Sequence, residues 1–204
     1  MTTGSQEIEA KFYVQDLDRI QARLEELGSQ LVQERVLETN IRFDLPGARL
    51  RAEGRVLRLR RDSNVRLTYK SASQKKDGVL SREEIEFTVE DFEKAKRFLE
   101  ALGYQKMFYY EKYRTTYQMS NTFIMLDELP YGDFVEIEGQ NHDSIHSMAD
   151  QLKLDWDAAI AASYHALFKR TCRSLNRTFE DLSFENFAGM AVAAKALGVR
   201  AADR

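Results

Sequence analysis

The sequence is poor in the residues that cross-link or interrupt a chain. Its 204 residues include a single cysteine, Cys172, and two prolines. One cysteine excludes an internal disulfide and any metal cluster built on cysteine ligands, and it is typical of an intracellular protein with one inert, partly buried thiol. We therefore expect the protein to be cytoplasmic.

Long apolar runs and an excess of one charge are missing as well. The opening residues, MTTGSQ, have neither the basic region nor the apolar stretch of a signal peptide. The most apolar late segment, residues 187–199, is too short to span a bilayer and contains Lys195. The 30 Lys and Arg against 33 Asp and Glu give a net charge of −3 and a pI near 5.8. We therefore expect no nucleic-acid or membrane partner.

Glycine-rich phosphate loops are also absent, because Gly47, Gly54 and Gly78 are isolated turn residues. His142 and His146 have the i,i+4 spacing that can hold a metal on a helix. They lack an H-E-x-x-H context, so we interpret them as solvated helix residues, and we interpret the third histidine, His165, as a packing residue.

What the sequence does contain is strict alternation of charged and apolar residues. Within residues 6–14, Glu7, Glu9 and Lys11 fall on one face of an expected strand, and apolar residues fall on the other. Two carboxylates and an ammonium group in two-residue steps can hold a divalent cation beside an anion. The alternative is the solvated outer face of an antiparallel sheet.

The same layout recurs in seven or eight expected strands. Five of them carry same-face pairs of like charge: Glu7 and Glu9, Arg58 and Arg60, Glu84 and Glu86, Lys112 and Arg114, and Glu136 and Glu138. Such repetition argues against a solvated face. If the sheet closes into a barrel, helices can cover its apolar outside while the charged faces line a wet interior. A highly charged ligand would offset the cost of turning these charges inward.

The inferred lining is richer in cations than in carboxylates. Its cations are Lys11, Arg42, Arg58, Arg60, Arg66, Lys70, Arg82, Lys112 and Arg114. A polyphosphate with bound Mg²⁺ or Mn²⁺ suits this lining, because guanidinium groups grip phosphate oxygens while carboxylates hold the metal.

Helical spacing separates the expected strands. Asp16 is the expected N-cap of a helix that Gly28 ends, and a second helix is expected over residues 90–102. Later helices are expected over residues 144–152 and 157–168, and an Ala-rich helix at the end. The tail could pack into the core, close one mouth of the barrel, or pair two copies as a homodimer. Core packing is the favoured interpretation.

Several motifs follow the order of a known family. The stretch E-I-E-A-K at residues 7–11 resembles the E-x-E-x-K signature of the CYTH superfamily, the triphosphate tunnel metalloenzymes, which include class IV adenylyl cyclases, thiamine triphosphatases and inorganic triphosphatases. Similar motifs follow as NIRFD (residues 40–44), LRLR (57–60), TYK (68–70), EIE (84–86), KYR (112–114), LDELP (126–130), VEIE (135–138) and SY (163–164). The resemblance covers residues 5 to about 170.

This resemblance implies an α+β fold, namely a closed eight-stranded antiparallel β-barrel over residues 1–170 with helices outside. Residues 171–204 would then form a C-terminal helical extension. It also implies a triphosphate-containing small molecule as the partner, together with Mg²⁺ or Mn²⁺.

The resemblance also implies roles for individual residues. Those expected to bind the catalytic metal are Glu7, Glu9, Glu136 and Glu138. Glu84, Glu86 and Asp127 would contribute to a second metal or orient basic residues. The triphosphate would be held by Lys11, Arg58, Arg60, Lys70, Lys112 and Arg114. The expected catalytic set is Glu7, Glu9, Lys11, Lys70, Arg58 and Arg60.

The favoured hypothesis is a metal-dependent triphosphatase that cleaves the terminal phosphate of an inorganic or organic triphosphate. The alternative is a class IV adenylyl cyclase that converts ATP to cyclic AMP and pyrophosphate. Those cyclases resemble one another in a His-Phe pair shortly before E-x-E-x-K, where this chain has Thr-Gly-Ser-Gln. A non-catalytic polyphosphate- or nucleotide-binding protein is a further hypothesis, and the retention of both acidic and basic pairs argues against it.

Overall fold

The computed structural model describes residues 5–76 and 79–203, and it describes their side chains except at residues 5–7, 75–76 and 79–81. The strands are β1 (Ser5–Val14), β2 (Gln30–Asp44), β3 (Val56–Arg61), β4 (Val65–Lys70), β5 (Gln74–Lys76), β6 (Val79–Val89), β7 (Gln105–Met119), β8 (Thr122–Leu129) and β9 (Gly132–Glu138). The helices are α1 (Leu17–Glu26), α2 (Arg49–Ala52), α3 (Phe92–Ala101), α4 (His142–Gln151), the 3₁₀ turn η1 (Trp156–Ala158), α5 (Tyr164–Ser174) and α6 (Ala194–Leu197).

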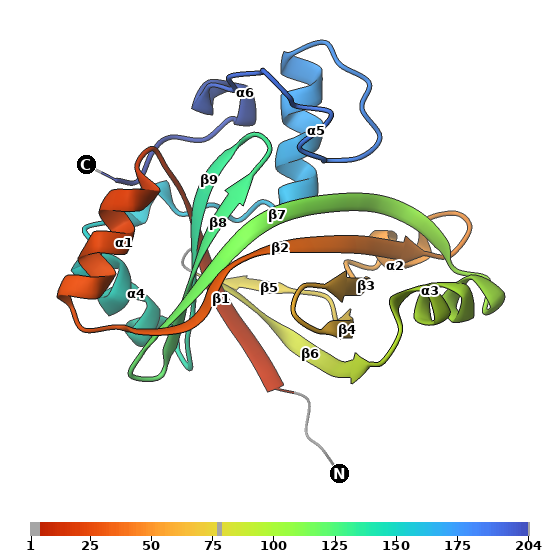
Figure 1. The fold of residues 1–204 in the computed structure, drawn as a ribbon, viewed down its shortest axis with the longest axis horizontal. Helices are drawn as coiled ribbons and strands as arrows, with labels where there is room; N and C mark the ends of the chain where they lie inside the picture. Colours follow the sequence, from red (N-terminus) through yellow and green to blue (C-terminus); the bar gives the residue numbers. More distant parts are fainter. Residues whose placement is uncertain (1–4, 77–78, 204) are drawn as a thin grey trace.

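The described strands belong to one strongly curved antiparallel sheet (Figure 1). Their order is β1-β9-β8-β7-β2-β3-β4-β6-β5. Because β1 pairs with β9 along one side and with β6 along the other, the pairings link eight strands in a circuit. The expected α+β class with eight antiparallel strands is confirmed. A ninth strand, β5, pairs with β6.

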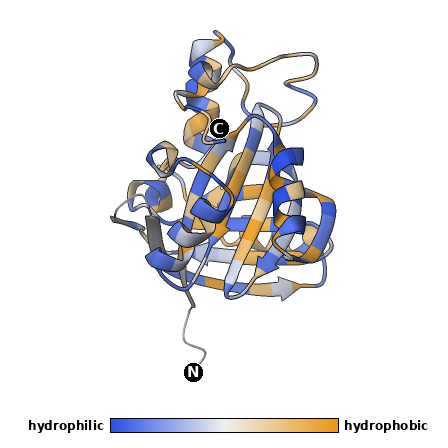
Figure 2. Cartoon of the chain, turned by 90° about the vertical axis from the view of Figure 1, so that its left-hand side faces the viewer, coloured by the Kyte–Doolittle hydropathy of each residue, from blue (hydrophilic) through white to orange (hydrophobic). Residues whose placement is uncertain are grey.

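The alternation in the sequence sets the two faces of this sheet, and Figure 2 shows hydrophilic and hydrophobic segments following each other along the strands. In β3, Leu57 and Leu59 are buried in a cluster with Phe92 and Leu99 of α3. The arginines that alternate with them, Arg58 and Arg60, therefore point to the other face. Burial of the leucines by α3 thus fixes the direction of the charged side chains.

Helices cover the outer face in separate groups. The aliphatic outer residues of β1, β8 and β9 pack against Ile20 and Leu24 of α1 and Ile145 and Met148 of α4. Helix α1 begins as predicted, since the Asp16 side chain accepts a hydrogen bond from Arg19 N at 2.9 Å. No helix in the described part of the chain is both long and apolar enough to cross a lipid bilayer.

The bounds of the helix predicted over residues 157–168 are wrong. Between residues 157 and 163 only the end of η1 is helical, and α5 starts at Tyr164 and runs on to Ser174. Two hydrogen bonds explain the late start. Ile160 N donates to Lys11 O of β1 at 2.7 Å, which holds this segment against the sheet, and the Ser163 side chain caps α5 by accepting from Ala166 N at 3.2 Å.

The tail packs into the protein core. Leu182, Phe187 and Leu197 are buried in a cluster that also contains Phe108 of β7 and Phe168 of α5. Leu182 exchanges backbone hydrogen bonds of 3.0 Å with β7. The Ala-rich helix at the end is short, covering only Ala194–Leu197. Helix α5 runs across residue 170. The predicted division of the chain into residues 1–170 and a C-terminal extension stays a prediction.

We predict that Leu182→Ala destabilises the whole protein, because Leu182 is fully buried between the tail and β7. The expected loss in the free energy of unfolding is about 2–5 kcal/mol, measured by urea denaturation. Leu31→Ala is the control, because Leu31 is 45% exposed, and it should cost less than about 1 kcal/mol. An equally small loss for Leu182→Ala would contradict a shared core.

Candidate functional site

A cavity of about 570 Å³ lies within the circuit of strands, and side chains from all eight strands of the circuit line it. Ten lysines and arginines and five glutamates contribute to this lining. The basic residues are Lys11, Arg42, Arg51, Arg55, Arg58, Arg60, Lys70, Arg82, Lys112 and Arg114, and the acidic residues are Glu9, Glu84, Glu86, Glu136 and Glu138.

The structure brings together most of the residues that the sequence singled out. Eight of the nine predicted cations line the cavity, and Arg66 does not. Arg66 instead bonds to Asp62 at 2.5 and 2.7 Å in the turn between β3 and β4. Glu7 pairs with Arg82 through the backbone of β1 and β6, but its side chain lies outside the described part, so its role stays a prediction.

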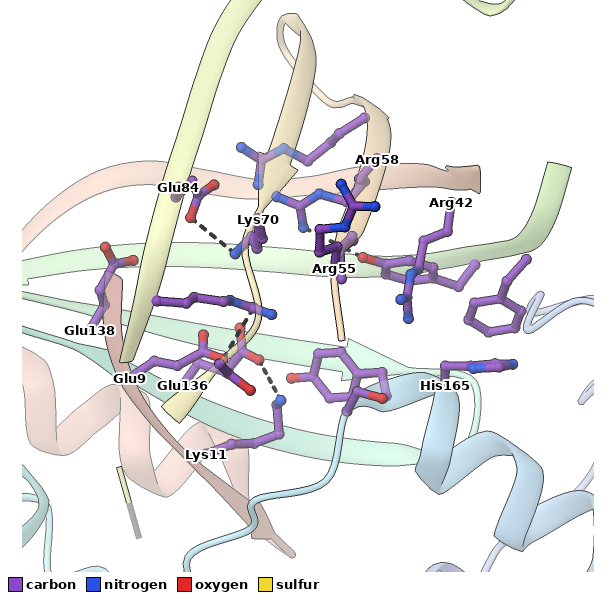
Figure 3. A pocket seen from close by; sticks show the side chains of 18 of the residues that line it. Glu9, Lys11, Arg42, Arg55, Arg58, Lys70, Glu84, Glu136, Glu138 and His165 are labelled. Carbon is purple, nitrogen blue, oxygen red and sulfur yellow. Dashed lines mark hydrogen bonds and ion pairs between the residues drawn. The ribbon is translucent and has the colours of Figure 1, made fainter. Parts of the chain in front are cut away.

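Four of the five lining glutamates gather at one end of the cavity, which we call the carboxylate end (Glu9, Glu84, Glu136 and Glu138; Figure 3). Glu9 of β1 lies directly across from Glu138 of β9, and Lys11 lies across from Glu136. Because strand partners in register share a face, Glu9, Glu138, Lys11 and Glu136 reach the same region of the cavity.

Ion pairs neutralise much of the charge at this end. Lys11 Nζ lies 3.0 Å from Glu136, and Lys70 Nζ lies 3.0 Å from Glu84. Burial would raise the pKa of Glu136, but Lys11, Lys112 and Arg114 hold it well below its usual value. The carboxyl group is therefore ionised across the physiological pH range.

Asp127 of β8 has no exposure to solvent and does not line the cavity. Its two oxygens accept hydrogen bonds from Arg114 Nε and Nη2, both at 2.6 Å, and from Lys112 Nζ at 2.8 Å. The Tyr164 hydroxyl also donates to it at 2.8 Å. These contacts fit the expectation that Asp127 orients basic residues, since a metal could reach it only by displacing them.

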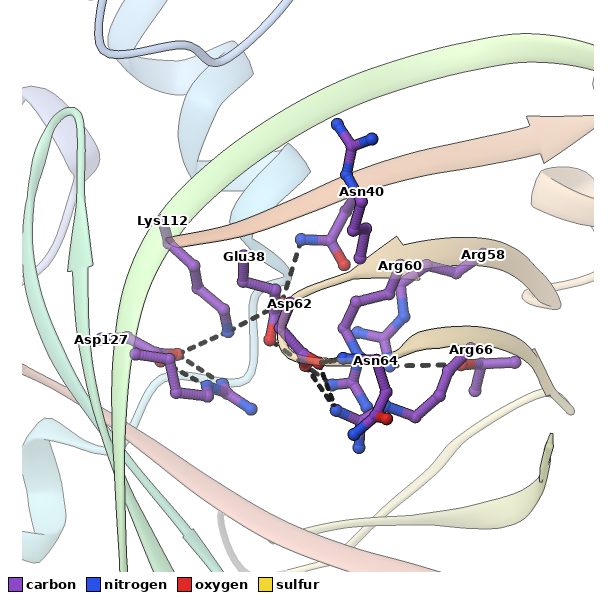
Figure 4. Close-up of polar contacts among 12 residues, drawn as sticks. Glu38, Asn40, Arg58, Arg60, Asp62, Asn64, Arg66, Lys112 and Asp127 are labelled. Carbon is purple, nitrogen blue, oxygen red and sulfur yellow. Dashed lines mark hydrogen bonds and ion pairs between the residues drawn. The ribbon is translucent and has the colours of Figure 1, made fainter. Parts of the chain in front are cut away.

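A second buried carboxylate, Glu38 of β2, was missed by the sequence analysis (Figure 4). It is 1% exposed and accepts a hydrogen bond from Asn40 Nδ2 at 3.0 Å. It also pairs with Arg60 at 3.5 Å and Lys112 at 3.7 Å. Burial would raise the pKa of Glu38, yet these cations and Arg114 lower it strongly. Extending the alternation of β2 back by two residues from Asn40 would have found it.

The other end of the cavity, which we call the arginine end, is formed by Arg42, Arg51, Arg55, Arg58 and His165. Arg51, Arg55 and His165 were not among the predicted site residues. Both arginines come from α2 and the turn after it, where no strand alternation marks a face. His165 does pack, as predicted, with its ring centroid 4.5 Å from that of Phe108, and it lines the cavity as well.

Several guanidinium groups keep an unpaired donor. The buried Nε atoms of Arg42, Arg55, Arg58 and Arg60 have no hydrogen-bond partner among the described residues. An unpaired buried donor is unfavourable, so the lining is suited to an anionic ligand that brings many acceptor oxygens.

The described carboxylates do not form a ready-made metal site. Among the described side chains, no group of three His, Cys, Asp or Glu is placed to hold a metal ion. The predicted metal role of Glu7, Glu9, Glu84, Glu86, Asp127, Glu136 and Glu138 therefore stays a prediction.

Comparison with known proteins agrees with this geometry. The model of the CYTH domain family matches residues 5–159. A protein of Methanocaldococcus jannaschii named as a candidate adenylate cyclase is 29% identical over 134 residues, which is 65% of this chain and 75% of that protein.

Two solved structures share the fold. A candidate adenylate cyclase of Vibrio parahaemolyticus superposes with a TM-score of 0.72 at 20% identity, covering 81% of this chain and 99% of that one. A candidate adenylyl cyclase of Hippeastrum, described as having a dominant triphosphatase activity, gives a TM-score of 0.60 at 17% identity over 85% and 97% of the two chains. With the match over residues 5–159 and the charged cavity inside the sheet, this chain belongs to the CYTH domain family.

Proposed function

We propose that the protein is a metal-dependent triphosphatase whose circuit of strands is a closed tunnel around its substrate. The observation that carries this proposal is the lining of the cavity, in which ten basic side chains outnumber five glutamates. Inorganic triphosphate or the triphosphate of an organic molecule supplies the negative charge that this lining lacks. The separate carboxylate end supplies oxygen ligands for a cation.

The basic residues would hold the phosphate chain from several strands at once. Arg58 and Arg60 extend from β3, Lys70 from β4, and Lys112 and Arg114 from β7. Guanidinium forks bind phosphate oxygens through two parallel hydrogen bonds, whereas the lysines act as point charges. Cations fixed in this way stabilise the charge that spreads over the phosphoryl oxygens during transfer.

The carboxylate end fits Mg²⁺ or Mn²⁺. Glu9 and Glu138 stand opposite each other in register, and they offer only oxygen donors, which both metals prefer. Mg²⁺ is commonly bound through one or two carboxylates together with substrate phosphates. When bound, the metal would polarise phosphoryl oxygens and neutralise part of their charge.

In the reaction, one water molecule adds across the terminal phosphoanhydride bond. The water oxygen forms a bond to the terminal phosphorus, the bond to the bridging oxygen breaks, and orthophosphate and the shortened phosphate chain leave. The role of this chain is to position the substrate and to supply fixed positive charge, with Asp127 holding Lys112 and Arg114 in place.

Adenylyl cyclase activity is the second candidate, because the relatives from Methanocaldococcus jannaschii and Vibrio parahaemolyticus carry that name. The protein from Hippeastrum, described as dominantly a triphosphatase, supports the first candidate. The arginine end also favours hydrolysis, since a cyclase must seat a neutral adenosine beside the phosphates.

The products distinguish the two candidates. We expect the protein to release orthophosphate from inorganic triphosphate or ATP when Mg²⁺ or Mn²⁺ is supplied, and to stop when EDTA removes the metal. Chromatographic separation of the products provides the measurement. Cyclic AMP and pyrophosphate from ATP would establish the cyclase, and binding without any turnover would leave a non-catalytic binding protein.

Glu9→Gln should lower metal-dependent turnover by about 100-fold or more, because it removes a charged oxygen ligand from the carboxylate end. Glu83→Gln is the matched control, since Glu83 is exposed and adjoins the cavity residues Arg82 and Glu84 on β6. Initial rates at saturating metal and unchanged thermal unfolding would test the prediction. Normal turnover by Glu9→Gln would remove Glu9 from the site.

Asp127→Asn should impair both stability and turnover, because the buried Arg114 and Lys112 lose their shared counter-charge. Breaking a buried ion pair from one side costs about 3–5 kcal/mol in the free energy of unfolding. Asp150→Asn, which changes an exposed residue of α4, should cost at most about 1 kcal/mol. Urea denaturation and steady-state rates give both readouts, and a fully stable, fully active Asp127→Asn would rule out the orienting role.

A further inference from the structure

The two ends of the cavity differ in how their charges are balanced. All five lining glutamates come from β1, β6 and β9, which are neighbours in the circuit of strands. Arg42, Arg51 and Arg55 come from β2, α2 and the turn after α2, and these elements contribute no carboxylate to the lining. The glutamates therefore enter the cavity from one side of the circuit, whereas basic groups reach both ends (Figure 3).

Arg42 carries a positive charge that no nearby carboxylate of the described residues balances. It lines the cavity, its Nε atom is unpaired, and the described residues offer it no carboxylate within ion-pair distance. Burial lowers the pKa of Arg42 most, Tyr110 raises it, and the nearby Arg58, Arg82 and Arg51 lower it further. By contrast, Lys11 and Lys70 each have a glutamate at 3.0 Å.

The pKa of His165 reflects its burial and also the positive charge of Arg42. Its side chain lines the cavity and the residue is 8% exposed. Burial, with Arg42 as the next largest cause, lowers the pKa of His165 to about 4. It lies in the first turn of the 11-residue helix α5, whose positive end adds to the local potential.

We propose that the arginine end is an additional phosphate subsite, through which the cavity selects linear polyphosphates of four or more phosphates over triphosphate and ATP. This inference rests on the proposed triphosphate site at the remaining cations. Lys11, Arg60, Lys70, Lys112 and Arg114 line the part of the cavity assigned to three phosphates, and Arg58 lies between that part and the arginine end. A fourth phosphate brings the negative charge that Arg42 lacks.

A nucleoside suits the arginine end less well. A neutral base would bury Arg42 beside Arg58 without offsetting their repulsion. The aromatic rings nearby are also occupied. Phe108 is 1% exposed and stacks on Tyr110 with centroids 5.5 Å apart, which occupies one face of each ring that base recognition could use.

Binding without metal tests the subsite directly. Isothermal titration calorimetry of the full chain in EDTA would compare linear triphosphate, linear tetraphosphate and ATP. We expect tetraphosphate to bind at least about tenfold more tightly than triphosphate, as one added charge-assisted contact provides, and ATP to bind no more tightly than triphosphate. Equal affinities for the two polyphosphates, or tightest binding of ATP, would overturn the proposal.

Arg42→Gln should remove this preference by weakening tetraphosphate about tenfold while triphosphate changes less than about threefold. Arg61→Gln is the matched control, because Arg61 is on β3 but exposed over the ring of Phe92, outside the cavity. Equal weakening of both polyphosphates by Arg42→Gln would count against a separate subsite. If Arg42→Gln does not fold by thermal melting, the affinities of the unaltered protein decide the matter.

Hydrolysis is measured separately with Mg²⁺ present, which keeps the two proposals apart. Orthophosphate release from triphosphate without a preference for tetraphosphate would overturn the subsite alone. A clear preference in binding without any orthophosphate release would overturn the proposed triphosphatase and leave the subsite standing.

Discussion

The fully buried carboxylate of Asp127 is the contact on which the charged interior depends. Two cations from β7 and the hydroxyl of Tyr164 on α5 converge on it. The ring of Tyr164 also lies under the ammonium groups of Lys11 and Lys112, at 4.3 and 5.2 Å from its centroid. Through Tyr164 the late helix is joined to the interior of the sheet.

The faces of the strands were predictable because alternation is imposed by the backbone itself. Once Leu57 and Leu59 are buried against α3, Arg58 and Arg60 have only the inner face left. The same logic located the lining residues on β1, β4, β6, β7 and β9, and the order of the motifs pointed to the family that the comparison then identified.

What the sequence did not reveal depends on contacts between distant segments. Arg51 and Arg55 reach the cavity because Asp44 caps α2 by accepting from Leu50 N and Arg51 N at 2.8 and 3.0 Å, which folds the α2 segment back. The late start of α5 follows from a hydrogen bond to β1, about 150 residues earlier in the chain. Neither local propensity nor periodicity can identify hydrogen-bond partners that are far apart in the sequence. Alternation likewise does not explain why the Arg66 side chain binds Asp62 instead of lining the cavity.

The ion pairs at the carboxylate end have a thermodynamic consequence. An incoming anion competes with Glu136 for Lys11 and with Glu84 for Lys70. Each carboxylate released in this way then becomes a better acceptor for a proton or a solution cation. Anion binding and cation uptake are therefore linked functions, and each must raise the affinity for the other by the same factor.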